Sequence, residues 1–123
     1  MSGNKYLLDT NAILYILNGD ETLADFLFED ELYVSVISEM ELLSYKNITD
    51  KEKKEIKAFL EDCIITNIDN KIRLQNIEVK KISNMKLPDS IIAGTAISLK
   101  LPLITSDKQF KTLTGLNLVY YEK

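Results

Sequence analysis

The stretch Lys5-Tyr-Leu-Leu-Asp9-Thr-Asn-Ala-Ile-Leu14-Tyr-Ile-Leu17 decides the fold. It begins with a short apolar run that ends at an acid, Asp9, and continues with apolar residues at helical spacing. This pattern predicts a buried strand over residues 5–9 and a helix over residues 10–18. In open α/β sheets, ligands bind beyond the carboxyl ends of the strands. Asp9 is therefore expected at a position where a carboxylate can take part in chemistry.

The rest of the chain alternates between strand and helix patterns in the same way. Strands are expected over residues 31–36, 64–68, 103–105 and 116–120, and helices over 22–28, 37–44, 51–61, 69–83, 89–100 and 107–113. Such alternation favours parallel crossover units. We predict an α/β fold, a three-layer α/β/α sandwich with a central, mostly parallel five-stranded sheet. Ala93, Gly94 and Ala96 are expected to let their helix approach the sheet closely.

Length and composition are those of an ordinary globular protein. A chain of 123 residues is expected to form one domain, residues 1–123. No apolar run approaches the roughly 20 residues that span a bilayer, and the N-terminus lacks the pattern of a signal peptide. We therefore expect no membrane association. The lone cysteine, Cys63, is expected to be a buried free thiol, which agrees with a cytoplasmic location.

The chain contains no histidine. This excludes Ser-His-Asp and Cys-His nucleophilic sites and every histidine-based metal site. Chemistry near neutral pH must then depend on carboxylates, hydroxyls, lysines or a bound hard metal. The net charge of −4 argues against a basic nucleic-acid clamp. It remains compatible with a nuclease whose acids are paired with a divalent metal.

Three acids are expected on one rim of the sheet. Asp9 ends the first strand, Glu41 lies in the first turn of the helix after the second strand, and Asp107 follows the fourth strand. In a parallel sheet the carboxyl ends of strands and the N-termini of the helices that follow them share one edge. A fourth acid, Asp89, begins a helix that follows another helix, so topology alone does not bring it to this rim.

Each acid also has a purely structural interpretation. Asp9 and Asp107 could be helix N-caps, and Ser38 with Glu41 fits a capping box. Asp89 could complement a helix dipole. As a group, however, the carboxylates would repel one another by roughly 4 kcal/mol at about 4 Å and an effective dielectric near 20. A hard divalent cation would relieve this repulsion, and oxygen-only ligands suit Mg²⁺ or Mn²⁺.

Four stretches of the sequence resemble the PIN-domain family and, within it, the small VapC-type toxins of toxin–antitoxin pairs. They run in the family's order and are spread over the whole chain. The stretches are Leu7-Leu-Asp-Thr-Asn11, Val34-Ser-Val-Ile-Ser-Glu-Met-Glu-Leu42, Leu87-Pro-Asp-Ser-Ile-Ile-Ala-Gly-Thr-Ala96 and Leu103-Ile-Thr-Ser-Asp-Lys-Gln-Phe110.

The resemblance implies a metal-dependent endoribonuclease acting on RNA. It also implies that Asp89 joins the other three acids in one pocket, and that the four hold Mg²⁺ or Mn²⁺ directly or through water. Whether one or two ions bind stays open. A homodimer and a proteinaceous antitoxin are implied as well. The acids implied as metal ligands are Asp9, Glu41, Asp89 and Asp107, and the polar residues implied to orient them, or to act as caps and turn formers, are Thr10, Asn11, Ser38 and Thr105.

Two other functions stay open. Many family members have a glycine shortly after the second acid, where this chain has Ser44-Tyr45. The departure leaves room for a PIN-like module that binds RNA or a partner without catalysis. An acid after the first strand also suits a phosphoryl-transfer enzyme with an aspartyl-phosphate intermediate. The signature of that class needs a second aspartate two residues later, where this chain has Asn11.

Overall fold

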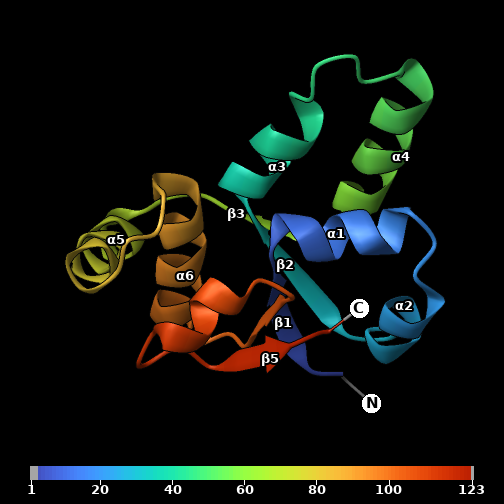
Figure 1. The fold of residues 1–123 in the computed structure, drawn as a ribbon. Helices are drawn as coiled ribbons and strands as arrows, with labels where there is room; N and C mark the ends of the chain where they lie inside the picture. The colour runs from blue at the N-terminus through green and yellow to red at the C-terminus, as the bar shows by residue number, and fades with distance from the viewer. Residues whose placement is uncertain (1–2, 123) are drawn as a thin grey trace.

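Five strands form one sheet in the computed structural model, which describes residues 3–122 (Figure 1). The strand order is β3-β2-β1-β4-β5, and each neighbouring pair is parallel. The predicted α/β class and five-stranded sheet are confirmed. Residues 1, 2 and 123 of the predicted domain lie outside the described part. The strands are β1 (Lys5–Leu8), β2 (Glu31–Ser35), β3 (Ile64–Thr66), β4 (Leu103–Thr105) and β5 (Leu118–Tyr120).

Helices link the strands and cover both faces of the sheet, so the predicted three-layer arrangement is also confirmed. Within residues 3–122 they comprise α1 (Thr10–Leu17), α2 (Glu21–Phe26), α3 (Val36–Leu43), α4 (Asp50–Glu61), α5 (Asn70–Ile82), α6 (Leu87–Leu99) and the 3-10 helix η1 (Lys108–Thr112).

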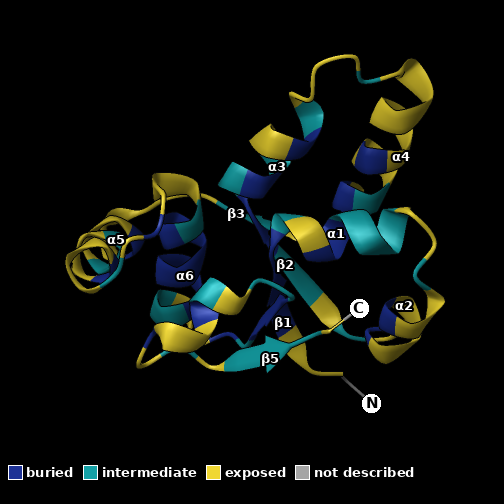
Figure 2. Ribbon diagram, in the orientation of Figure 1, coloured by how far each residue is buried: buried dark blue, intermediate teal, exposed yellow. Residues whose placement is uncertain are grey.

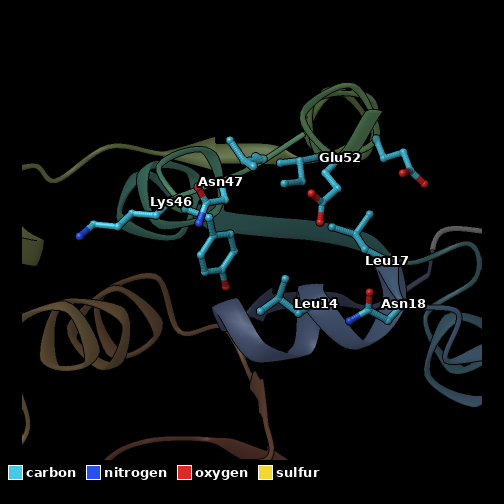
Figure 3. A pocket seen from close by; sticks show the side chains of 10 residues that line it. Leu14, Leu17, Asn18, Lys46, Asn47 and Glu52 are labelled. Atoms are coloured by element: carbon cyan, nitrogen blue, oxygen red, sulfur yellow. The ribbon is translucent and has the colours of Figure 1, made fainter. Parts of the chain in front are cut away.

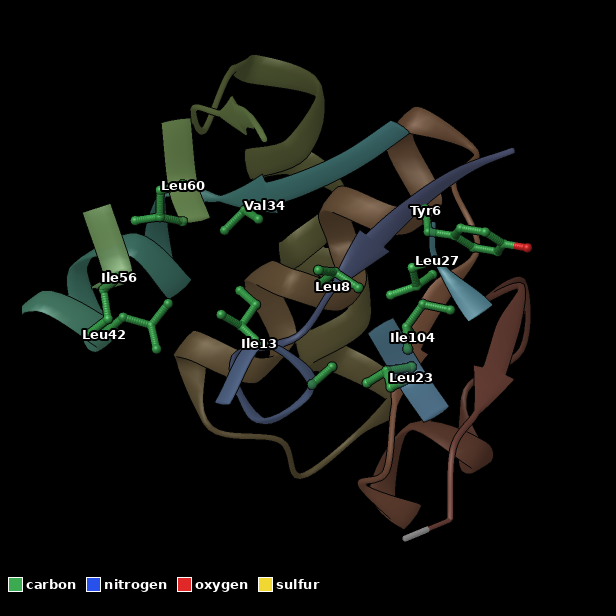
Figure 4. Packing of buried hydrophobic residues seen from close by; sticks show 11 residues of the cluster. Tyr6, Leu8, Ile13, Leu23, Leu27, Val34, Leu42, Ile56, Leu60 and Ile104 are labelled. Atoms are coloured by element: carbon green, nitrogen blue, oxygen red, sulfur yellow. The ribbon is translucent and has the colours of Figure 1, made fainter. Parts of the chain in front are cut away.

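Two core clusters lie on opposite faces of the sheet. Successive side chains of a strand point to opposite faces, so Leu8 packs with α1 to α4 (Figure 4), whereas Leu7 packs with α5, α6 and η1. In Figure 2 the middle of α6 is buried, while much of the surface of α4 and α5 is exposed. The chain therefore holds its central strand, β1, between two packed layers.

Two helix starts differ from the prediction in ways that affect the site. β2 ends at Ser35, whose side chain accepts a hydrogen bond from the backbone N of Ile37 at 3.1 Å and so caps α3. Because α3 already starts at Val36, Glu41 lies in its second turn, and the prediction of the first turn is wrong. α6 starts two residues earlier than predicted, which leaves Asp89 inside its first turn.

The small residues of α6 pack against two different elements, the sheet and α5. Ala93 and Ala96 pack in the cluster that includes strand residues, as predicted. Gly94 instead faces α5, since a Cβ there would lie 3.1 Å from the backbone N of Asn76. The expectation that Gly94 approaches the sheet is wrong, and its role is to allow the close crossing of α5 and α6.

None of the helices in residues 3–122 combines the length and the apolar character needed to cross a membrane. Cys63 is half-buried rather than buried, and its thiol donates a hydrogen bond to the backbone carbonyl of Phe59 at 3.4 Å. Burial, with a contribution from the charge of Asp62, raises the pKa of this thiol to about 11. The thiol therefore stays protonated at neutral pH.

Candidate active site

A hollow of about 190 Å³ opens at the carboxyl ends of the strands. All four acids singled out from the sequence line it, although they come from four separate parts of the chain. Thr10 and Asn11, two of the four predicted supporting residues, line it as well. The full lining is Asp9, Thr10, Asn11, Glu41, Tyr45, Asp89, Ile92 and Asp107.

The topology of the sheet explains where this hollow forms. From β1 the chain moves to β2 and β3 on one side, and it later returns to β4 on the other side of β1. Connections leave β1 and β4 in opposite directions, which creates a crevice beyond their carboxyl ends. Asp9 follows β1 and Asp107 follows β4, so both acids stand at this crevice.

Asp9 is buried, with only 4% of its surface exposed. Its Oδ1 accepts a hydrogen bond from the backbone N of Ala12 at 2.8 Å and so caps α1. Its Oδ2 accepts a hydrogen bond from the hydroxyl of Thr105 at the end of β4. The cap interpretation is thus correct, but it uses only one of the two carboxylate oxygens.

Burial raises the pKa of Asp9 from 3.8 to about 6, because the charged form loses its hydration. The hydrogen bonds from Thr105 and Ala12 lower the pKa in part, and the charges of Asp107 and Asp89 raise it again. A buried carboxylate that faces other carboxylates makes this end of the sheet a region of negative potential. Such a region favours the binding of a cation.

Glu41 is held from the neighbouring helix α1. The hydroxyl of Thr10 lies 2.8 Å from Oε1 of Glu41 and 2.9 Å from Oγ of Ser38. Ser38 is buried inside α3 and does not cap it, because Ser35 does. The capping-box interpretation of Ser38 and Glu41 is therefore wrong, and these residues belong to a polar link between α1 and α3.

Asp89 and Asp107 are joined by Gln109. Its side-chain Nε2 donates to Oδ2 of Asp89 at 3.0 Å and to Oδ2 of Asp107 at 2.6 Å. Asp107 also caps η1, since its Oδ1 accepts from the backbone N of Gln109 at 3.0 Å, and its own N–H donates to Thr105 at 3.0 Å. Gln109 is not among the site residues predicted from the sequence. Its position two residues after an acid was the only available signal.

Tyr45 connects the acidic hollow to a second one. The second hollow, of about 250 Å³, lies between α1, α4 and the loop that follows α3, and Leu14, Lys46 and Glu52 are among its lining residues (Figure 3). Tyr45 is partly exposed and lines both hollows. The departure from the family pattern at Ser44-Tyr45 therefore lies directly beside the acids.

The donors around the acidic hollow suit a hard cation by their chemistry. They are carboxylate, hydroxyl and amide oxygens, with no imidazole or thiol among them. Within residues 3–122, no three acidic or cysteine side chains are grouped closely enough to share one ion as they stand. Direct coordination of one ion by three of these carboxylates would therefore require at least one of them to rotate.

Comparison with known protein families decides the identity of this fold. The family model of the PIN domain matches residues 6–116. The chain belongs to the PIN-domain family. The match includes all four acids of the hollow, and the family resemblance proposed from the sequence is confirmed. A search of curated proteins gives no match.

Solved structures of toxin–antitoxin complexes contain chains similar to this PIN domain. The first is VapBC2 from Rickettsia felis bound to a DNA fragment from its promoter, with 22% identity, a TM-score of 0.84, and coverage of 96% of this chain and 99% of that one. A toxin–antitoxin complex from Klebsiella pneumoniae gives 27% identity, a TM-score of 0.81 and coverage of 96% and 99%. VapBC-1 from nontypeable Haemophilus influenzae gives 25% identity, a TM-score of 0.80, and coverage of 94% of this chain and 97% of that one.

Proposed function

We propose that this PIN-domain protein is a metal-dependent endoribonuclease and the toxin of a type II toxin–antitoxin pair. The observation that carries the proposal is that Asp9, Glu41, Asp89 and Asp107 line one hollow. Members of this family are in general nucleases, and the similar solved chains come from toxin–antitoxin complexes. The substrate is RNA, and the required cation is Mg²⁺ or Mn²⁺.

The four carboxylates would hold the cation, directly or through water. A bound divalent ion supplies a water of lowered pKa and neutralises charge that develops on the phosphate. Residues of the chain hold the carboxylates in place. Thr105 fixes Asp9 through a hydrogen bond from β4, and Thr10 fixes Glu41 from α1. Asn11, which is exposed at the edge of the hollow, is free to contact the RNA backbone.

The proposed toxin function also implies protein partners. We assign a proteinaceous antitoxin, since the similar chains named above belong to complexes with one. We also assign a homodimer, supported by a set of large apolar side chains that α5 and α6 leave exposed. These side chains are Leu74, Ile77, Ile82, Leu87 and Leu99. A cytoplasmic location agrees with the protonated free thiol of Cys63.

The test compares two aspartates that cap helices in the same way. Purified protein is incubated with structured RNA and Mg²⁺, and cleavage rates are measured for the natural chain, Asp9→Asn and Asp69→Asn. Asp69 caps α5 through the backbone N of Ile72 at 2.8 Å, but it is exposed and lies outside the hollow. Asp9→Asn is expected to reduce the rate by about 10³-fold or more, which corresponds to ~4 kcal/mol. Asp69→Asn is expected to leave it within about twofold.

Removal of the metal by a chelator is the second part of this test. EDTA is expected to stop cleavage, and added Mg²⁺ or Mn²⁺ is expected to restore it. Cleavage that survives EDTA, or that Asp9→Asn leaves intact, would contradict the proposal. Binding of Mn²⁺ and RNA without cleavage would favour the alternative, a PIN-fold binding module without catalysis. The Ser44-Tyr45 departure beside the acids is the feature that favours that alternative.

A further inference from the structure

One carboxamide connects two of the four acids. Nε2 of Gln109 lies 2.6 Å from Oδ2 of Asp107 and 3.0 Å from Oδ2 of Asp89. A carboxamide nitrogen carries two protons, so each acid receives one of them. Asp107 comes from the turn after β4, whereas Asp89 belongs to the first turn of α6. Gln109 therefore joins two acids that the backbone alone does not hold together.

Within residues 3–122, no basic side chain forms an ion pair with Asp89 or Asp107. The ion pair found in this part of the chain joins Lys81 and Glu78, away from the hollow. Hydrogen bonds to an ionised acceptor are shorter and stronger than neutral ones. The two donated by Gln109 are thus the direct compensation that Asp89 and Asp107 receive from side chains.

We propose that Gln109 is a positioning residue whose carboxamide takes the place of a cation between Asp89 and Asp107, and that a divalent metal has to displace it. This inference rests on the metal-binding part of the proposed function. Asp89 and Asp107 would hold the cation with the same carboxylates that now accept from Gln109, so cation and carboxamide would compete for them. The hydrogen bonds of Gln109 therefore stabilise the metal-free protein and weaken its affinity for metal.

The test removes the two donors and keeps the shape of the side chain. Gln109→Met is compared with Gln75→Met, a matched control on α5 that lines a different hollow. The Kd for Mn²⁺ is measured by titration calorimetry, and Tm is measured in EDTA and in saturating Mn²⁺. Gln109→Met is expected to lower Tm in EDTA by a few degrees. It is also expected to tighten Mn²⁺ binding by about tenfold, ~1.4 kcal/mol. Gln75→Met is expected to change neither.

The sign of the change in affinity decides the inference. Unchanged or weaker Mn²⁺ binding by Gln109→Met overturns it, and weaker binding would mean that Gln109 prearranges the acids for the metal. If the natural chain binds no Mn²⁺ but Gln109→Met does, the inference is supported. If neither binds Mn²⁺, both the inference and the metal dependence of the proposed function fail. If the natural chain binds Mn²⁺ and Gln109→Met binds it more tightly, but the natural chain cleaves no RNA, the inference stands and only the proposed nuclease function fails.

A measurement on the natural chain keeps the inference testable if Gln109→Met fails to fold. The side-chain amide of Gln109 is followed by NMR during a titration with diamagnetic Mg²⁺. Displacement by the metal is expected to move its two proton signals towards those of a free carboxamide, while the signals of Gln75 stay in place. Signals of Gln109 that do not move at saturating Mg²⁺ would show that metal and amide are compatible.

Discussion

Two corners of the molecule contain the same residue types and differ in what surrounds them. At the first, β4 ends at Thr105, and Asp9 caps α1 after β1. At the second, β3 ends at Thr66, and Asp69 caps α5. Both aspartates accept a hydrogen bond from the backbone N three residues later at 2.8 Å. The local structure of the two caps is the same.

The difference arises from strand pairing. β1 and β4 are neighbours in the middle of the sheet, so Thr105 donates to Asp9 although they lie 96 positions apart. β3 is at the edge, Asp69 is exposed, and the buried hydroxyl of Thr66 finds no hydrogen-bond partner within residues 3–122. An N-cap becomes a candidate functional group only where the sheet buries it and brings other polar residues to it.

The largest difference between Asp9 and Asp69 is expected in how substitution of each aspartate changes the pH dependence of stability. Folding raises the pKa of Asp9 from 3.8 to about 6. Between these values the folded chain binds a proton that the unfolded chain has released, so stability falls as pH rises. Above about pH 6 the ionised form costs the folded state about 3 kcal/mol. Asp9→Asn removes this cost and keeps a good cap. It is expected to raise the free energy of unfolding in EDTA by about 1–3 kcal/mol at pH 7.5.

Urea unfolding at pH 7.5 and near pH 4 measures this change. The gain from Asp9→Asn is expected to fall below about 1 kcal/mol near pH 4, because the folded carboxyl is protonated there and the unfolded one, with a pKa of 3.8, is close to half protonated. Asp69→Asn is the control, and it is expected to change stability by less than about 0.5 kcal/mol at pH 7.5. Equal effects of the two substitutions at pH 7.5 would remove the distinction between the two corners.

The two strand-end threonines are expected to respond with opposite signs. Thr105→Val leaves Oδ2 of Asp9 without its hydrogen-bond donor and the N–H of Asp107 without an acceptor, which is expected to cost about 2 kcal/mol. Thr66→Val removes a buried hydroxyl that has no partner in the described residues. It is expected to be neutral or to stabilise the protein by about 1 kcal/mol. Urea unfolding at pH 7.5 compares the two, and a loss of stability from both would contradict the assignment of Thr66.

The smallest expected change in stability comes from removing the Asp69 cap of α5 alone. Asp69→Ala removes the side-chain acceptor for the backbone N of Ile72 and is expected to cost about 1 kcal/mol. The same RNA-cleavage assay is expected to show no change, because Asp69 lies outside the acidic hollow. A loss of cleavage from Asp69→Ala at a temperature where the protein is fully folded would mean that α5 contributes to the site.

Much of the architecture could be predicted because it depends on local patterns. The apolar run before Asp9 and the apolar periodicity after it indicate a strand followed by a helix, and the structure agrees to within one residue. Helix starts were less predictable, since a cap depends on backbone geometry. Ser35 and Ser38 both fit a cap by residue type, and the structure uses Ser35.

The candidate site was predicted in part, and for a physical reason. Parallel strands place their carboxyl ends together, so sequence and topology were enough to group Asp9, Glu41 and Asp107. The position of Asp89 required the family resemblance, because its helix follows another helix. Gln109 could not be predicted, since its hydrogen bond to Asp89 depends on how closely η1 and α6 approach and on the rotamer of one side chain.

The sequence by itself determined the order of strands and helices, the absence of histidine and the positions of the four acids along the chain. These features depend on residue types and on periodicity, which act over a few residues. Only the tertiary structure decided that Asp9 is buried against Thr105 while Asp69 remains an exposed cap. The physical reason is that burial and hydrogen bonding between distant residues depend on which strands pair, and pairing is a property of the whole sheet.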